Sequence, residues 1–160
     1  MPRPKPFKDK IPYIYKKNPE DLIMLGFVRA VNCHLQTVSE SRAIIMFLIK
    51  FNLSEDDYSI ESAQRSYRRM KFQFPNICEC GTVKEHEKKT GITGIVQRNA
   101  ENFILFGWMT GIIHVMPTIE IIQGIKLYLR ATGISQNELY DRYESYRKML
   151  SEYNNLLNIK

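Results

Sequence analysis

The sequence predicts an all-α protein made of two tandem three-helix repeats, each helix-turn-helix-like, with an extended basic arm at its N-terminus. Two observations lead to this prediction. Apolar residues recur at helical spacings of three and four, and no useful length of chain shows the alternation expected of a strand. The chain also aligns with itself without a gap, residues 18–54 on residues 99–135, at an offset of 81 residues.

In the self-alignment, residues of the same type recur at the same spacing, which indicates two copies of one packed unit. Identical pairs include Gly26 with Gly107 and Ile44 with Ile125. Farther along, at an offset of 79, SYRRM at 66–70 meets SYRKM at 145–149. We therefore expect four segments, an arm at 1–17, a first repeat at 18–74, a linker at 75–98 and a second repeat at 99–160.

The first repeat contains signals for three helices. Asn18 is a capping residue and Pro19 suits the first helical position, so a helix is expected from there to about Leu35. Residues 37–40 read Thr-Val-Ser-Glu, a capping-box pattern that predicts the start of a second helix. A third helix is predicted by a seam of apolar residues at Ile60, Ala63, Tyr67, Met70 and Phe74.

The second repeat shows the same order. Its second helix is expected to open at residues 117–118, and a turn follows at Gly133. The capping box at 135–138 then predicts a third helix with an apolar seam at Leu139, Tyr143, Tyr146, Leu150 and Tyr153. Between the repeats, Pro75 and several glycines predict a linker with one short helix near residues 83–89.

The formal net charge is +6, and it is concentrated in the arm. Residues 18–74 and 99–160 are each neutral, whereas residues 1–17 carry +5. Alternating prolines favour an extended arm. Such an arm can follow the DNA backbone, dock on a protein partner or act as a solubilising tail. Its basic residues are Arg3, Lys5, Lys8, Lys10, Lys16 and Lys17.

The third helix of each repeat is the second candidate for nucleic-acid contact. In a helix-turn-helix the last helix lies in the major groove, where Arg reads guanine, Gln reads adenine and cations hold phosphates. The candidates are Gln64, Arg65, Arg68, Arg69 and Lys71 in the first repeat and Arg142, Arg147 and Lys148 in the second. The alternative is that these are solvated faces of amphipathic helices, balanced by nearby acids. Tyr67 and Tyr146 are expected in the core.

The sequence contains few signals for a metal site, an enzyme or a membrane protein. Cys78 and Cys80, with His86 nearby, are a poor match to zinc-binding spacing, and no cofactor is expected. No catalytic motif occurs, so an enzyme is not expected. The apolar runs fall short of the roughly 20 residues that span a bilayer. Without a secretory signal, the expected compartment is a cytoplasm, that of the host if the chain is phage-encoded.

The sequence therefore predicts a small non-enzymatic DNA-binding protein, a regulator or accessory factor of the kind that a phage or mobile element encodes. It would use the paired helix-turn-helix-like units and the basic arm. The alternative is a helical protein-interaction module, such as a virion component, an adaptor or an inhibitor of a host protein. A helical outline alone does not choose between these two classes.

Overall fold

The computed structural model describes residues 19–35, 37–51, 53, 59–74 and 90–158, and in this part of the chain every regular element is a helix. The α-helices are α1 (Pro19–His34), α2 (Glu40–Lys50), α3 (Ile60–Gln73), α4 (Gly91–Val115), α5 (Ile121–Thr132) and α6 (Leu139–Asn158), and the short 3-10 helix η2 (Gln136–Glu138) precedes α6. The predicted all-α class is confirmed. The arm and the segment around residues 83–89 lie outside the described residues.

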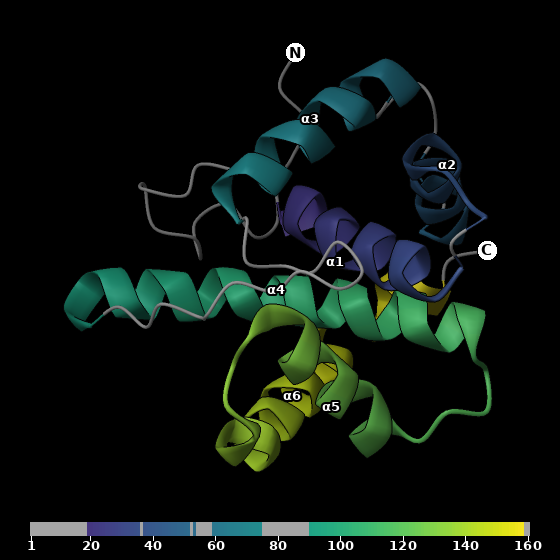
Figure 1. The fold of residues 1–160 in the computed structure, drawn as a ribbon. Coiled ribbons are helices and arrows are strands. Elements are labelled where there is room, and N and C mark those ends of the chain that lie inside the picture. The colour runs from purple at the N-terminus through teal and green to yellow at the C-terminus, as the bar shows by residue number, and fades with distance from the viewer. Residues whose placement is uncertain (1–18, 36, 52, 54–58, 75–89, 159–160) are drawn as a thin grey trace.

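The helices form two groups that meet along α1 and α4. Helices α1, α2 and α3 contact one another, as do α4, α5 and α6, and the contact between α1 and α4 is by far the most extensive in the molecule. Figure 1 shows α1 and α4 side by side at the centre, with α2 and α3 above them and α5 and α6 below. A single apolar core therefore runs through both groups, and it includes Phe27, Phe47, Trp108 and Tyr128.

The crossing of α1 and α4 depends on glycines. A β-carbon at Gly107 would overlap the carbonyl oxygen of Ile23, and one at Gly26 would overlap that of Ile104 and lie 2.6 Å from the backbone nitrogen of Trp108. At Gly111, a β-carbon would lie 2.7 Å from the carbonyl oxygen of Phe27. Because glycine has no side chain, the two backbones can approach to a distance that other residues forbid.

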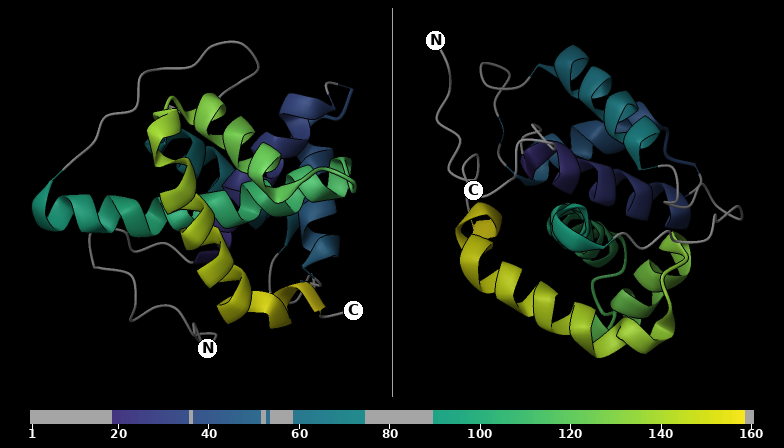
Figure 2. Two further views of the ribbon diagram at one scale, coloured as in Figure 1. Left: turned by 90° about the horizontal axis from the view of Figure 1, so that it is seen from below. Right: turned by 90° about the vertical axis from the view of Figure 1, so that its left-hand side faces the viewer.

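Helix α4 begins earlier than the sequence indicated. Residues 91–98, expected to be linker, form its first turns, and they extend beyond the other helices in Figure 2 (left). Arg98 connects this part of the helix to α6, since its guanidinium lies 2.6 Å from the Asp141 carboxylate and donates to the Ser145 hydroxyl at 3.0 Å. A contact with a distant segment thus supports helix where local glycines indicated a break.

The cap predicted at Ser135 is confirmed, since its hydroxyl accepts from the Asn137 backbone N–H at 3.1 Å at the start of η2, which leads into α6. The capping box predicted at residues 37–40 is wrong in detail. Helix α2 starts at Glu40 with Ser39 as its cap, whose hydroxyl accepts from the Arg42 backbone N–H at 3.2 Å. Glu40 is therefore the first helical residue, one position after the cap instead of three, and its carboxylate lies 3.0 Å from the Lys71 ammonium and 3.7 Å from the Arg29 guanidinium. Helix α5 likewise starts at Ile121, after the expected position at residues 117–118.

Candidate nucleic-acid interface

The outward side of α3 carries four exposed residues in one stripe. Arg65, Arg68, Arg69 and Phe72 have the spacing i, i+3, i+4, i+7, which places them on one face of a helix. On the opposite face Tyr67 is buried, as are Ala63 and Met70, so the predicted inward seam is confirmed there. We call Arg65, Arg68, Arg69 and Phe72 the α3 face.

The α3 face carries three positive charges that are not held in ion pairs. Within the described ranges, no carboxylate lies at ion-pair distance from Arg65, Arg68 or Arg69. Arg69 donates to the Ser66 hydroxyl at 3.2 Å, a bond that leaves its charge in place. Glu61, in the first turn, is exposed on the same side of α3 four residues before Arg65, and it is the only acidic residue of this helix. Three positive charges therefore point away from the helix pair that α3 packs on.

Gln64 and Lys71, the other two predicted contacts on α3, hold α3 to α2 instead. The Gln64 amide donates to the Ser41 hydroxyl at 3.0 Å, and the Lys71 ammonium pairs with Glu40 at 3.0 Å. Both side chains are partly buried between the helices. They position α3 and lie beside its exposed stripe.

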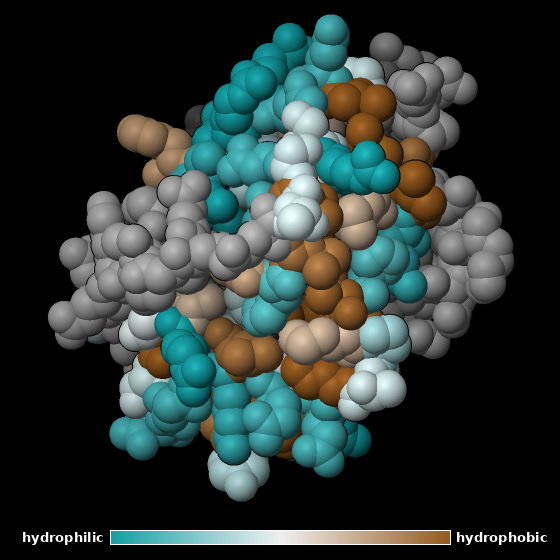
Figure 3. Space-filling view, turned by 45° about the vertical axis from the view of Figure 1, so that its right-hand side comes forward, coloured by the Kyte–Doolittle hydropathy of each residue, from teal (hydrophilic) through white to brown (hydrophobic). Residues whose placement is uncertain are grey.

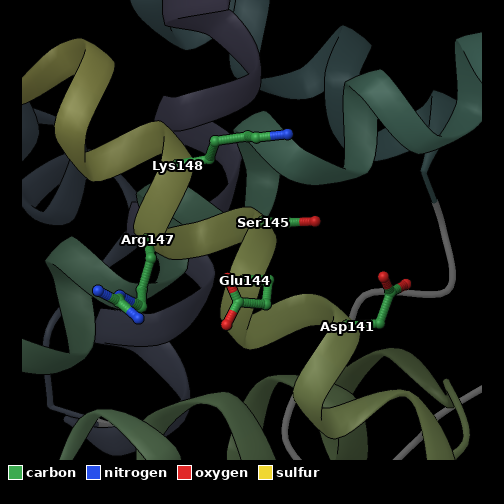
Figure 4. A pocket seen from close by; sticks show the side chains of 5 residues that line it. All are labelled: Asp141, Glu144, Ser145, Arg147 and Lys148. Atoms are coloured by element: carbon green, nitrogen blue, oxygen red, sulfur yellow. The ribbon is translucent and has the colours of Figure 1, made fainter.

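The corresponding positions of α6 present a different surface. Arg147 and Lys148 are exposed as predicted, but Glu144 and Asp141 stand beside them. With Ser145 these residues line a shallow depression of about 420 Å³, and Figure 4 shows that their side chains diverge from one helix instead of converging on a common point. Such a mixed-charge surface does not concentrate positive charge as the α3 face does.

Arg142 is not on the exposed side of α6, although the sequence suggested it as a nucleic-acid contact. Its side chain is 2% exposed, and its guanidinium lies 3.0 Å from the Glu101 carboxylate and 2.8 Å from that of Glu138. Burial alone would lower the pKa of Arg142, but the Glu101 and Glu138 carboxylates raise it, so the side chain stays charged. Arg142 is unavailable for a phosphate or a base.

Tyr128 completes this buried cluster. Burial raises the pKa of its hydroxyl, and the Glu101 carboxylate raises it further. The neutral hydroxyl donates to the Glu101 carbonyl oxygen at 3.3 Å. The cluster therefore joins α4, α5 and α6 through hydrogen bonds and opposite charges.

In neither group of helices does a short turn lead into a helix with a basic face, as a DNA-binding helix-turn-helix requires. The motif requires a turn of about three or four residues between its helices. Residues 51–59 separate α2 from α3, which is too long, although α3 carries the basic face. The connection from α5 to α6 is shorter and turns at Gly133, whose φ is 75°. The helix that follows it, however, has the mixed-charge surface.

The other residues considered for nucleic-acid or metal binding lie outside the residues that the structure describes. Arg3, Lys5, Lys8, Lys10, Lys16 and Lys17 lie outside them, as do Cys78, Cys80 and His86. In the part of the chain that is described, no group of three or more His, Cys, Asp or Glu side chains is placed to hold a metal ion. No helix of that part is long and apolar enough to cross a membrane.

The sequence reasoning overlooked Phe72, whose side chain is 85% exposed. The signal was present, because Phe72 follows Arg65 by seven residues and therefore continues the outward stripe instead of the inward seam. It also overlooked the exposed isoleucines of α2 and α4, namely Ile45, Ile49, Ile92 and Ile95.

Comparison with known proteins adds no relative: the chain matches no protein-family model, no curated protein and no solved structure.

Proposed function

We propose that this chain is a non-enzymatic DNA-binding protein that contacts DNA through the α3 face. The observation that supports the proposal is the row of Arg65, Arg68 and Arg69 along one exposed side of a helix. Arginines placed together neutralise phosphates and release the counterions condensed on DNA, which is the main source of affinity for nucleic acid. The basic arm adds six further positive charges to the proposed interface.

The proposed interface is asymmetric. Along α6, Glu144 replaces the first arginine of the α3 stripe and repels phosphate, while Arg142 is buried. The second group of helices therefore serves to hold the first, through the α1–α4 contact, more than to bind DNA itself. In this arrangement only one of the two third helices, α3, contacts DNA, whereas the sequence predicted a pair of equivalent helices that contact DNA.

Changing Arg65, Arg68 and Arg69 together to Ala should weaken duplex binding and reduce its salt dependence. Loss of three phosphate contacts is expected to reduce the slope of log affinity against log salt by about 3. The measurement is fluorescence anisotropy of a labelled duplex over a salt series with the full chain. These side chains are exposed, so the fold should be retained, as circular dichroism can verify.

The matched control is the double change Arg147→Ala with Lys148→Ala, which also removes exposed positive charge from a third helix. We expect it to reduce the slope by less than about 1. Equal losses in the two variants would show that net charge, and not the α3 face, governs binding. Absence of duplex binding by the wild-type protein at low salt would end the proposal.

We propose in addition that the two groups of helices are tandem repeats of one three-helix unit. Shifted by 81 residues, α1 falls on residues 100–115 of α4 and α2 falls on residues 121–131, within α5. The glycine contacts support the idea further: Gly26 meets Ile104, and Gly107, its partner in the alignment, meets Ile23, the partner of Ile104. Such reciprocal contacts are typical of a two-fold interface between like units.

A protein-interaction module is the second candidate, and the exposed isoleucines favour it. Ile49 is 74% exposed on α2, while Ile92 and Ile95 are 80% and 62% exposed on the first turns of α4. On the face drawn in Figure 3, hydrophobic residues form a broken band between hydrophilic regions. Apolar side chains exposed next to each other, as Ile92 and Ile95 are one helical turn apart at the start of α4, are typical of protein-binding sites.

If the first turns of α4 bind a protein, changing Ile92 and Ile95 together to Ser should abolish binding to that partner and leave duplex binding unchanged. The measurement is co-purification of partners with the full chain, followed by the anisotropy assay on the same variant. The control is the change Ile45→Ser on α2, which removes a less exposed isoleucine elsewhere. If both variants retain every partner, the first turns of α4 have no such role.

A further inference from the structure

Phe72 is the most exposed large apolar residue among those the structure describes, and it lies at the end of a row of arginines. Its side chain is 85% exposed, one helical turn beyond Arg68 and Arg69. From Arg65 to Phe72 the stripe covers about 10 Å along the helix axis. A flat aromatic ring and three cations are therefore presented together on the α3 face.

The core does not account for Phe72. Helix α3 packs inward through Ala63, Tyr67 and Met70, each of them buried, so Phe72 contributes little to holding the helix in place. In the proposed alignment of the repeats, the position of Phe72 is taken by Ser151 on α6, where a polar residue meets solvent. An aromatic ring thus follows the exposed arginines of α3 but does not follow Arg147 and Lys148 at the corresponding place on α6.

A major-groove duplex reader does not account for it either. Recognition helices contact base edges mainly with their N-terminal residues. In α3 the first turn carries the acidic Glu61, and the arginines and Phe72 follow in later turns. In the major groove, moreover, the contact open to a phenyl ring is the thymine methyl group, because the faces of the bases are stacked on each other.

We infer that the α3 face binds single-stranded DNA, with the Phe72 ring stacked on an unpaired base and Arg65, Arg68 and Arg69 on neighbouring phosphates. Proteins that bind single strands combine a positively charged track with aromatic side chains that receive bases, and such stacking tolerates any sequence. The inference depends on the proposed DNA-binding function and names the form of DNA that this face prefers.

Changing Phe72 to Ser tests the inference. Stacking of a base on an aromatic ring is lost with this change, so affinity for labelled oligo(dT) should fall about tenfold. Affinity for a duplex of the same length should change by less than about twofold, because the phosphate contacts remain. Both are measured by anisotropy with the full chain in the same buffer.

Two variants separate stacking from other effects of the change. Tyr140 is also exposed, at 74%, but it lies on α6 beside Asp141. Changing Tyr140 to Ser should therefore leave oligo(dT) binding unaltered. Changing Phe72 to Leu keeps an apolar side chain without an aromatic face, and it should weaken oligo(dT) binding nearly as much as Ser does.

A direct readout comes from Phe72→Trp. The chain's single native tryptophan, Trp108, is 1% exposed and supplies a constant background emission. Stacking on a base should quench the emission of the new tryptophan when oligo(dT) is added. Unquenched emission in the bound complex would overturn the inference.

The two proposals fail in distinguishable ways. If the wild-type protein binds neither oligo(dT) nor duplex at low salt, the DNA-binding function itself fails. If it binds duplex through the arginines but Phe72→Ser leaves oligo(dT) affinity unchanged, the function stands and the single-strand inference is wrong. Loss of oligo(dT) affinity with duplex affinity retained supports both.

Discussion

Replacing Arg142 by Met is expected to destabilise the protein by about 3–5 kcal/mol, because it removes the guanidinium that pairs with the buried Glu101 carboxylate and with that of Glu138. The Glu101 side chain is only 10% exposed and that of Glu138 22% exposed. With the guanidinium removed, Glu101 must either stay ionised in a poorly solvated site or take up a proton. Both outcomes cost free energy that the folded state does not recover elsewhere. Urea unfolding followed by circular dichroism measures the change.

Arg147→Met is the matched control, since Arg147 lies on the same helix and is exposed, with its guanidinium 5.7 Å from the centre of the Tyr143 ring. We expect an effect within about 0.5 kcal/mol there. Adding Glu101→Gln to Arg142→Met should recover part of the lost stability, because a neutral amide is less costly to bury than a carboxylate. If Arg142→Met costs no more than its control, the buried cluster does not have the role assigned to it.

The second large effect is expected at the crossing of α1 and α4. Changing Gly107 to Ala should destabilise the fold by about 3 kcal/mol, at the upper end of the range for overpacking. The added methyl group would overlap the Ile23 carbonyl and lie 2.6 Å from its carbon, and these are backbone atoms that cannot move alone. The two helices must separate, which opens the core on both sides. Thermal unfolding measures the loss.

Gly124 provides the control, because it also lies inside a helix and is buried. A β-carbon there would meet the end of the Met109 side chain, at 2.7 Å from its terminal methyl, and a methionine can change rotamer. Gly124→Ala should thus cost little, and the higher helix propensity of Ala, worth up to about 1 kcal/mol, can make it stabilising. Equal losses at Gly107 and Gly124 would contradict this account of the crossing.

Gly26→Ala extends this prediction to the proposed repeat. If the α1–α4 contact joins two like units across an approximate two-fold axis, the changes at Gly26 and Gly107 should cost similar amounts, since each glycine faces the partner of the other's contact. A large loss at one site with little at the other would leave the duplication without support from the packing.

Much of the helical architecture followed from local patterns. The seam through Ala63, Tyr67 and Met70 is buried as expected, and Tyr146 is buried on α6. Helix periodicity predicts such positions because side chains three and four residues apart share a face. The candidate site was less predictable. Three of the predicted contacts on α3 are exposed, whereas Gln64 and Lys71 pair with α2.

Arg142 shows why the charges of neighbouring residues do not predict whether a side chain is exposed. Its neighbours in sequence, Asp141 and Glu144, suggested a solvated face. Yet Arg142 is three residues after Leu139 and four before Tyr146, which places it on the inward side of α6. Burial there is tolerable only because Glu101, from a distant helix, lies 3.0 Å away. No local pattern reports that partner.

The start of α4 was missed for a related reason. Glycines near residue 91 are local signals for a break, and they led to the prediction of a linker. The helix that forms instead is supported by contacts of Arg98 with Asp141 and Ser145 on α6. Where local preference is weak, contacts with distant segments decide the end of a helix.

The helical class and the inward seams can therefore be predicted from the sequence, because the spacing of apolar residues is a property of each helix taken alone. The packing of α1 against α4 at Gly26 and Gly107, the burial of Arg142 beside Glu101 and the pairing of Lys71 with Glu40 were decided by the tertiary structure. Each depends on which backbone or carboxylate, distant in sequence, lies opposite a given residue. That is also why two third helices of similar sequence present different surfaces.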